Sequence, residues 1–156
     1  MVSDESNAVF PSPVGVLRAT FSNEGLVSLE LSGQGEPLIR GAGVLADRLA
    51  CELAAYFAGA SEPFKTPLDL SAGTPFQQRV WRELRRVPFG KTVSYAELAR
   101  RVGAPGAARA VGQAAGANPV LIIVPCHRVV RSDGALGGFS AGLDIKRWLL
   151  RHEGCL

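Results

Sequence analysis

The sequence predicts a small α/β domain, made of an antiparallel sheet and a helix, followed by a mostly α domain of the winged helix-turn-helix type. Two short runs of alternating apolar and polar residues precede a helical pattern in the first half. A stretch with two prolines and little periodicity, residues 60–73, follows them. The second half then shows helical patterns separated by glycine-containing turns. We expect the α/β domain over residues 1–66, a linker over 67–73, and the mostly α domain over 74–156.

The first domain is predicted from a hairpin and a helix. Residues 14–22 and 25–33 alternate apolar and polar side chains, and Gly25 lies in the turn between them. Residues 43–59 carry an apolar residue every fourth position, which is typical of an amphipathic helix, and Gly59 marks its end. This half shows no group of residues with evident chemistry.

The second domain opens with three predicted helices. Thr74 and Pro75 have the residue types that favour the N-cap and first position of a helix. Ser94 begins a second helix, in which Glu97 has the spacing of a capping box. A third helix is expected over residues 107–117 after a turn that contains glycine. Two short helices joined in this way are typical of a helix-turn-helix.

The third helix and the segments that follow it have unusual features. Residues 107–117 are rich in Ala and Gly, so the surface of this helix is nearly bare, which costs stability but permits close approach of a partner. Residues 120–124 are apolar and indicate a buried strand. Asp133 and Gly134 predict the turn of a hairpin that would form a wing. A last helix is expected over residues 143–154.

Charge divides the chain in the same place as the predicted domains. Residues 1–73 hold four basic and nine acidic side chains, whereas residues 74–156 hold thirteen basic and five acidic ones. A basic half joined to an acidic half is typical of a nucleic-acid-binding domain with a companion domain. Because runs of charge are most often solvated surface, this pattern favours nucleic acid only modestly.

Composition excludes several classes of protein. No apolar run approaches the roughly 20 residues that cross a bilayer, so we expect no membrane association. The N-terminus lacks the pattern of a signal peptide, so we expect a cytoplasmic protein. Three cysteines predict no disulfide framework. A zinc site is not expected either, because the four Cys and His residues of the second half lack the usual ligand spacing; these are Cys126, His127, His152 and Cys155.

A thiol, an imidazole and a guanidinium lie side by side in VLIIVPCHRVV, residues 120–130. Cys126 could be a small buried apolar residue, as cysteines often are. It could equally be a reactive thiol, since reactivity depends on its local pKa rather than on neighbours in sequence. This stretch by itself leaves both interpretations open.

Six segments of the basic half resemble the O6-alkylguanine-DNA alkyltransferases in order and spacing. The resemblance covers residues 73–154, and PCHRV is its most specific motif. It implies a ribonuclease-H-like first domain, a winged helix-turn-helix second domain, and no cofactor or metal. The segments are GTPFQQRVW, SYAELA, PGAARAVG, NPVLIIVPCHRVV, GALGGFS and KRWLLRHEG.

The resemblance implies direct repair of double-stranded DNA by a single-use, monomeric enzyme, which takes alkyl groups from O6 of guanine and also from O4 of thymine. Cys126 would accept the alkyl group from a base flipped out of the duplex. His127 would be linked to Cys126 through water, and Glu153 would hold His127 in the useful tautomer. Tyr95 would protonate N3 of the guanine.

The resemblance also assigns residues to DNA and to the base pocket. Arg109 would fill the space that the flipped base leaves, while the bare helix around it lies in the minor groove. Asn118 would also stabilise the turns around the active-site segment. Further DNA contacts are expected from Ala108, Gly112, Asn118 and Arg128, and the pocket is expected to include Val124, Phe139, Ser140 and Tyr95.

Two departures from the family pattern concern the range of substrates. Phe139 replaces a common tyrosine and Ala141 a common glycine, so the acceptance of bulky adducts is not predicted.

Three other functions compete with alkyl transfer. A non-catalytic lesion-binding protein is disfavoured because such relatives lack the cysteine found at Cys126. A helix-turn-helix regulator with a redox-sensing cysteine would leave Tyr95 and Glu153 without a role. A Cys-His hydrolase lacks an oxyanion-hole motif.

Overall fold

The computed structural model describes residues 6–32 and 43–156, and it divides into two compact units between Leu70 and Ser71. The dividing point lies within the stretch predicted as a linker, residues 67–73. Part of that stretch nevertheless belongs to the first unit, because Leu26 N–H donates to the Pro67 carbonyl at 2.8 Å and Asp69 N–H donates to the Leu26 carbonyl at 2.8 Å.

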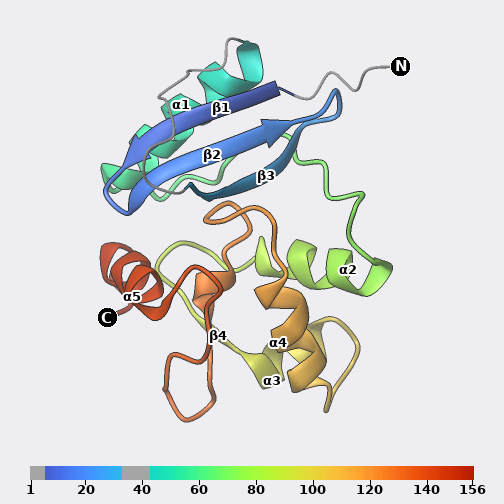
Figure 1. Ribbon diagram of the computed structural model, residues 1–156. Coiled ribbons are helices and arrows are strands. Elements are labelled where there is room, and N and C mark those ends of the chain that lie inside the picture. The colour runs from blue at the N-terminus through green and yellow to red at the C-terminus, as the bar shows by residue number, and fades with distance from the viewer. Residues whose placement is uncertain (1–5, 33–42) are drawn as a thin grey trace. The chain divides into compact units, whose positions relative to one another are not determined.

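The first unit is a three-stranded antiparallel sheet with one helix packed on it (Figure 1). The predicted hairpin is confirmed as β2 (Gly15–Phe21) and β3 (Leu26–Leu31), and the predicted helix as α1 (Val44–Phe57). The sequence reading missed β1 (Ser6–Ser12), which pairs with β2 along its whole length. Alternate residues of β2 are buried, as a sheet with one covered face requires.

Three helices begin the second unit. They are α2 (Pro75–Leu84), α3 (Tyr95–Arg101) and α4 (Ala108–Gly116). Thr74 and Gln77 form a full capping box at α2. At α3 only half of the expected box exists: Ser94 accepts from the Glu97 N–H, but the Glu97 carboxylate binds Arg100 and Arg101 instead. The Trp81 indole of α2 donates to the Ala114 carbonyl at 2.8 Å and so fixes α4 against α2.

The segment around Cys126 is not the strand that the sequence predicts. Residues 120–124 form buried turns, Cys126–Arg128 form one turn of 3-10 helix (η1), and only β5 (Val129–Val130) is extended. Ile122 has a φ of 73°, which a β-branched residue rarely adopts and a strand does not contain. The apolar run is therefore fully buried, as expected, but as compact turns.

A short parallel pairing brings two parts of the second unit together. Strand β4 (Val93–Ser94) lies beside β5, with Val93 opposite Val129. Tyr95 directly follows β4, and η1 directly precedes β5. This register therefore places the start of α3 next to the turn that carries Cys126.

The predicted wing and the last helix complete the unit. The turn at Asp133 and Gly134 is present, because Arg131 N–H donates to the Ala135 carbonyl at 2.9 Å. The returning residues 135–139 form no strand, so the wing is a loop rather than a hairpin. Helix α5 (Leu143–His152) follows as predicted. Among the described residues, no helix is long and apolar enough to cross a membrane.

Candidate active site

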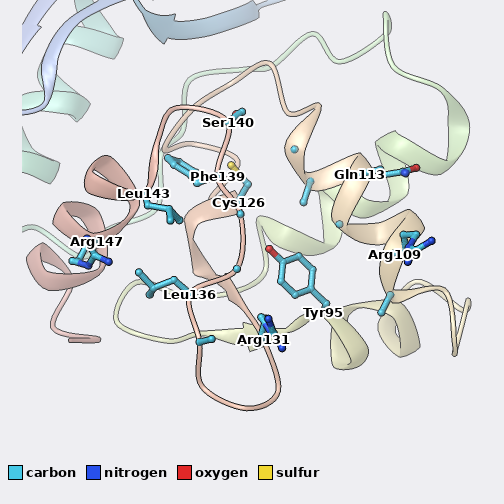
Figure 2. A pocket seen from close by; sticks show the side chains of 17 residues that line it. Tyr95, Arg109, Gln113, Cys126, Arg131, Leu136, Phe139, Ser140, Leu143 and Arg147 are labelled. Carbon is cyan, nitrogen blue, oxygen red and sulfur yellow. The ribbon is translucent and has the colours of Figure 1, made fainter.

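An open pocket of about 1140 Å³ lies within the second unit (Figure 2). One side is formed by α4 and the start of α3, and the other by loop 131–140 and the start of α5. Cys126 lies between the two sides. The pocket thus collects residues from four separate segments around one thiol.

Cys126 is buried and its sulfur is hydrogen-bonded. The Asn118 side-chain amide donates to Sγ at 3.2 Å and to the Val124 carbonyl at 2.7 Å. Burial raises the pKa of the Cys126 thiol, while the bond from Asn118 and the positive charge of Lys146 oppose this rise. The thiol is therefore protonated in the resting protein, next to groups that favour its anion.

His127, Glu153 and Arg128 form a buried hydrogen-bonded group behind Cys126. His127 Nε2 lies 2.6 Å from Glu153 Oε2, and neither side chain is exposed to solvent. Arg128 donates to both oxygens of Glu153, at 2.7 and 3.0 Å. His127 Nδ1 is buried and has no hydrogen-bond partner among the described residues. Burial lowers the pKa of His127, and the Glu153 carboxylate opposes this effect.

Tyr95 is half-buried, and its hydroxyl is directed into the pocket in Figure 2. Burial and the charge of a Cys126 thiolate raise the pKa of Tyr95, whereas hydrogen bonding to the Gly138 backbone lowers it. A Cβ on Gly137 would lie 2.8 Å from the hydroxyl oxygen, and Gly137 has a φ of 74°. Glycine is therefore required at this position for both space and backbone conformation.

Lys146 of α5 is buried and holds the loop that forms one side of the pocket. Its ammonium donates to the carbonyls of Val129, Leu136 and Gly138, at 2.7, 2.5 and 3.1 Å. Burial lowers the pKa of Lys146 to about 8, and the charge of a Cys126 thiolate opposes this shift. This cation therefore both fixes the loop and favours the thiolate.

The structure places most of the residues expected on DNA along α4. Ala108, Arg109 and Gly112 line the pocket, and Arg109 is exposed and points away from Cys126 in Figure 2. Phe139 and Ser140, expected in the base pocket, line the opposite side. The exposed positions of α4 carry small or polar side chains, which agrees with the bare surface expected for this helix.

Three of the expected site residues lie elsewhere. Arg128 is buried against Glu153 and the Val87 carbonyl, which does not agree with a DNA contact. Val124 lies outside the pocket wall, and its carbonyl accepts from Asn118 and from the Cys126 N–H. Asn118 also lies outside the wall and fastens the turns, since its side-chain oxygen accepts from the Val120 N–H at 2.9 Å.

Lys146 and Gly137 were missed by the sequence reading. Lys146 precedes the buried Leu149 and Leu150 by three and four residues, so helical periodicity places its ammonium on the apolar face of α5. That position was the available signal, because a lysine on such a face needs polar partners. For Gly137 the run GALGG indicated only a loop. No three Cys, His, Asp or Glu side chains gather as metal ligands within the described ranges.

Comparison with known proteins gives one family. The sequence model of the DNA-binding domain of 6-O-methylguanine DNA methyltransferase matches residues 75–155. The methylated-DNA–protein-cysteine methyltransferase of Mycobacterium leprae is 47% identical over 147 residues, which are 91% of this chain and 88% of that protein. The protein of the same name from Salmonella typhimurium is 52% identical over 108 residues, 69% of this chain. That match spans 63% of the Salmonella protein, which is less than two thirds of its length.

Solved structures agree with the sequence comparison. The crystal structure of the O6-methylguanine methyltransferase of Mycobacterium tuberculosis has a TM-score of 0.85 and 42% identity, over 96% of this chain and 92% of that one. The structure of the same organism's OGT in complex with DNA has a TM-score of 0.84 and 43% identity, over 94% and 91% of the two chains. The chain therefore belongs to the 6-O-methylguanine DNA methyltransferase family.

Proposed function

We propose that this chain repairs double-stranded DNA by moving the alkyl group of O6-alkylguanine, and of O4-alkylthymine, onto Cys126. The observation that carries the proposal is the position of the Cys126 thiol, between a hydrogen-bonded His127–Glu153 pair behind it and the Tyr95 hydroxyl in the open pocket. This arrangement supplies a nucleophile, a base and a proton donor around one space.

Activation of the thiol begins at His127. Its Nδ1 atom is buried and lacks a protein partner among the described residues, a situation that costs about 1–3 kcal/mol unless another polar group binds there. A water molecule between Nδ1 and Cys126 would satisfy this atom and carry the thiol proton to the imidazole. Asn118 and Lys146 then stabilise the thiolate as it forms.

The transfer step exchanges one bond for another. The Cys126 thiolate attacks the alkyl carbon, the sulfur–carbon bond forms, and the bond from carbon to O6 breaks with its electron pair left on guanine. Tyr95 donates its proton to N3 of the base, and the imidazolium of His127 supplies the proton that restores the Tyr95 hydroxyl. The net products are guanine and a neutral thioether, so no cofactor or metal is needed.

The DNA contact is proposed for the α4 side of the pocket. A relative 43% identical has been solved in complex with DNA, and residues 74–156 of this chain carry the basic excess. We propose that α3 and α4 act as a winged helix-turn-helix, that α4 lies in the minor groove, and that Arg109 occupies the space of the flipped base. We further propose that the α/β unit is ribonuclease-H-like. Residues 1–66 and 74–156 are proposed to act as two domains, and the chain is proposed to act as a monomer.

Two of the residues expected to bind DNA receive other roles. Arg128 is assigned to Glu153, because its guanidinium is already bound there. Asn118 is assigned to the turns and the sulfur. Ser140, which lines the pocket, is assigned to recognition of the guanine edge. Val124 is not, because its carbonyl already accepts two hydrogen bonds. Phe139 supplies an apolar wall beside Ser140.

A redox-sensing regulator is the main competing function, and two features of Cys126 argue against it. Sensor cysteines are exposed and have a low pKa, so that oxidants reach a thiolate. Cys126 is buried, and burial raises its pKa. A regulator would also give no role to Tyr95 in the pocket. The expectation of a cytoplasmic location stays a prediction.

A count of repaired lesions tests the proposal. With excess O6-methylguanine duplex, repaired lesions should reach a plateau at one per protein molecule, because nothing in the site can cleave a thioether. Cys126→Ser should abolish repair, while Cys155→Ser, a change at the half-buried cysteine outside the pocket, should leave it intact. Continued turnover, or repair by Cys126→Ser, would contradict the proposed function.

A further inference from the structure

Arg128 joins three segments of the second unit behind the pocket. Its Nε and Nη2 atoms donate to the two oxygens of Glu153, just after α5, at 2.7 and 3.0 Å. Its Nη1 atom donates to the Val87 carbonyl, just after α2, at 2.6 Å. The side chain is only 10% exposed. A two-pronged, buried bond of this kind fixes the plane of the carboxylate as well as its position.

The guanidinium helps to keep Glu153 ionised, together with His127. Arginine is always charged and can only donate, and here it donates to both oxygens of the carboxylate. Burial would raise the pKa of Glu153, but the hydrogen bonds from His127 and Arg128 lower it to about 2. Glu153 is therefore an anion, and an ionised carboxylate can only accept.

An accepting Glu153 in turn decides which nitrogen of His127 carries the proton. Nε2 lies 2.6 Å from Glu153 Oε2 and must donate to it, which leaves Nδ1 of the neutral ring as the acceptor. We propose that Arg128 is a positioning residue: by holding both oxygens of Glu153, it fixes His127 as the Nε2–H tautomer and makes Nδ1 the proton acceptor. This inference rests on the proposed function, in which His127 is the general base. It assigns to Arg128 the role of orienting that base through Glu153.

Other charged groups near this site act on the same atoms. Lys146, from α5, and Arg128 both lower the pKa of His127, while Glu153 raises it. Burial and the charge of Glu153 raise the pKa of Cys155, beyond α5, whereas the charges of Arg128 and Lys91 lower it. Lys146 is bound to three backbone carbonyls, so it cannot replace Arg128 on the carboxylate. Arg128, rather than the general positive charge around His127, is therefore the cation that binds the carboxylate facing Nε2.

Nitrogen-15 NMR of the wild-type protein tests the tautomer without any alkyl transfer. The chain has two histidines, so the signals of His127 and His152 are readily separated, and a His152→Gln variant assigns them. We expect His127 to be the neutral Nε2–H form at neutral pH, because burial lowers its pKa, and the Glu153 carboxyl carbon to show no protonation in the ordinary carboxyl range. An Nδ1–H tautomer, or a Glu153 that titrates in the ordinary carboxyl range, would overturn the proposal.

Variants of Arg128 test its part in the rate. Arg128→Lys keeps the charge but loses the two-pronged bond, so alkyl transfer should slow by about 10- to 100-fold, as when the partner that orients a metal-bound histidine is removed. Arg128→Met should be slower still, and its rate should fall on acidification at a higher pH than in the wild type, because Glu153 then lacks its permanent cation. Both variants should show a mixture of His127 tautomers.

Arg86→Met is the matched control, because Arg86 is an exposed arginine paired with Glu83 outside the pocket. It should leave the rate, the pH profile and the tautomer unchanged. A wild-type rate and pH profile in Arg128→Lys and Arg128→Met would overturn the role of Arg128. If neither variant folds, the His127 tautomer and the ionisation of Glu153, both measured in the wild-type protein, decide whether the proposal stands. If the wild-type protein transfers no alkyl group at all, the proposed function fails, while the tautomer remains measurable.

Discussion

The two walls of the pocket differ in burial and in bonding. The inner wall is buried, apart from the half-buried Asn118, and every residue in it is hydrogen-bonded. The outer wall is exposed or half-exposed, and its Arg131 and Arg147 are paired with exposed aspartates. By the inner wall we mean Cys126 together with the residues packed behind it, which do not themselves line the pocket: Asn118, His127, Arg128 and Glu153. The outer wall is Arg109, Gln113, Arg131 and Arg147.

Under the proposed function, this difference separates the residues of the chemistry from those of DNA recognition. Groups that move a proton must be held close to their productive geometry, which burial and hydrogen bonds achieve. Groups that contact a long polyanion work from an exposed surface, where they attract phosphates over a distance. Changes in the inner wall should therefore alter stability and the rate with every substrate. Changes in the outer wall should alter only the reaction with duplex DNA.

The inner wall should make stability depend on acid. The folded-state pKa of Glu153, about 2, lies below its ordinary value of 4.5, so its contribution to stability is present above about pH 4.5 and is lost as the pH falls towards 2. The shift corresponds to roughly 3 kcal/mol at neutral pH. Urea unfolding at several pH values should show this loss in the wild type and much less of it in Glu153→Gln. Glu24→Gln, in an exposed turn, is the control; an equal slope in all three proteins would contradict the account.

Tyr95 stands between the two walls, and its neighbour Gly137 tests how tightly it is held. Gly137→Ala places a Cβ against the Tyr95 hydroxyl, so transfer should slow by about 10- to 100-fold with DNA and with a free alkylated base alike. Gly138→Ala is the matched control, because a Cβ there meets nothing within 4 Å. Equal single-turnover rates for the two variants would show that the position of Tyr95 does not limit the reaction.

Arg109 tests the outer wall. Arg109→Ala should slow repair of duplex DNA by about tenfold, because filling the space of the flipped base is worth part of the few kcal/mol that unstacking costs. Transfer from free O6-benzylguanine should hardly change, since no base has to be flipped. Arg86→Ala should affect neither reaction. Equal losses on both substrates would remove Arg109 from base flipping.

Salt dependence should give the smallest effect. Arg131 and Arg147 line the pocket opposite α4 and are paired with the exposed Asp133 and Asp144, at 3.0 and 3.5 Å. If each binds one phosphate, its replacement by alanine should reduce the slope of log affinity against log salt by about 0.9. Fluorescence anisotropy with an unmodified duplex measures this slope, and an unchanged slope would place these arginines off the DNA.

Much of the fold could be predicted from local sequence signals. The β2–β3 hairpin, α1 and α5 follow from alternation, periodicity and glycine positions, and the structure confirms them. Strand β1 was missed because its pairing with β2 is a tertiary contact. The run at 120–124 was read as a strand because an apolar run shows burial, while the turns there depend on Asn118 and on the positive φ of Ile122.

The positions of site residues could be predicted where a residue type implies a chemistry and not where only contacts decide, and the catalytic roles stay predictions. Cys126 and Tyr95 were expected in the pocket and line it. Arg128 could not be separated from a DNA-binding arginine, because its bond to Glu153 joins residues 25 positions apart in the sequence. Lys146 was hidden for the same reason, since its three acceptors are carbonyls of a loop whose path the sequence does not reveal.

The intact mass of the protein after incubation with an O6-methylguanine duplex shows whether Cys126 accepts the alkyl group. The account predicts a gain of one methyl group per molecule, mapped by peptide analysis to Cys126 and absent with an unmodified duplex. The other cysteines, Cys51 and Cys155, lie outside the pocket and serve as internal controls. No gain in mass, or a methyl group on Cys51 or Cys155 instead of Cys126, would contradict the account.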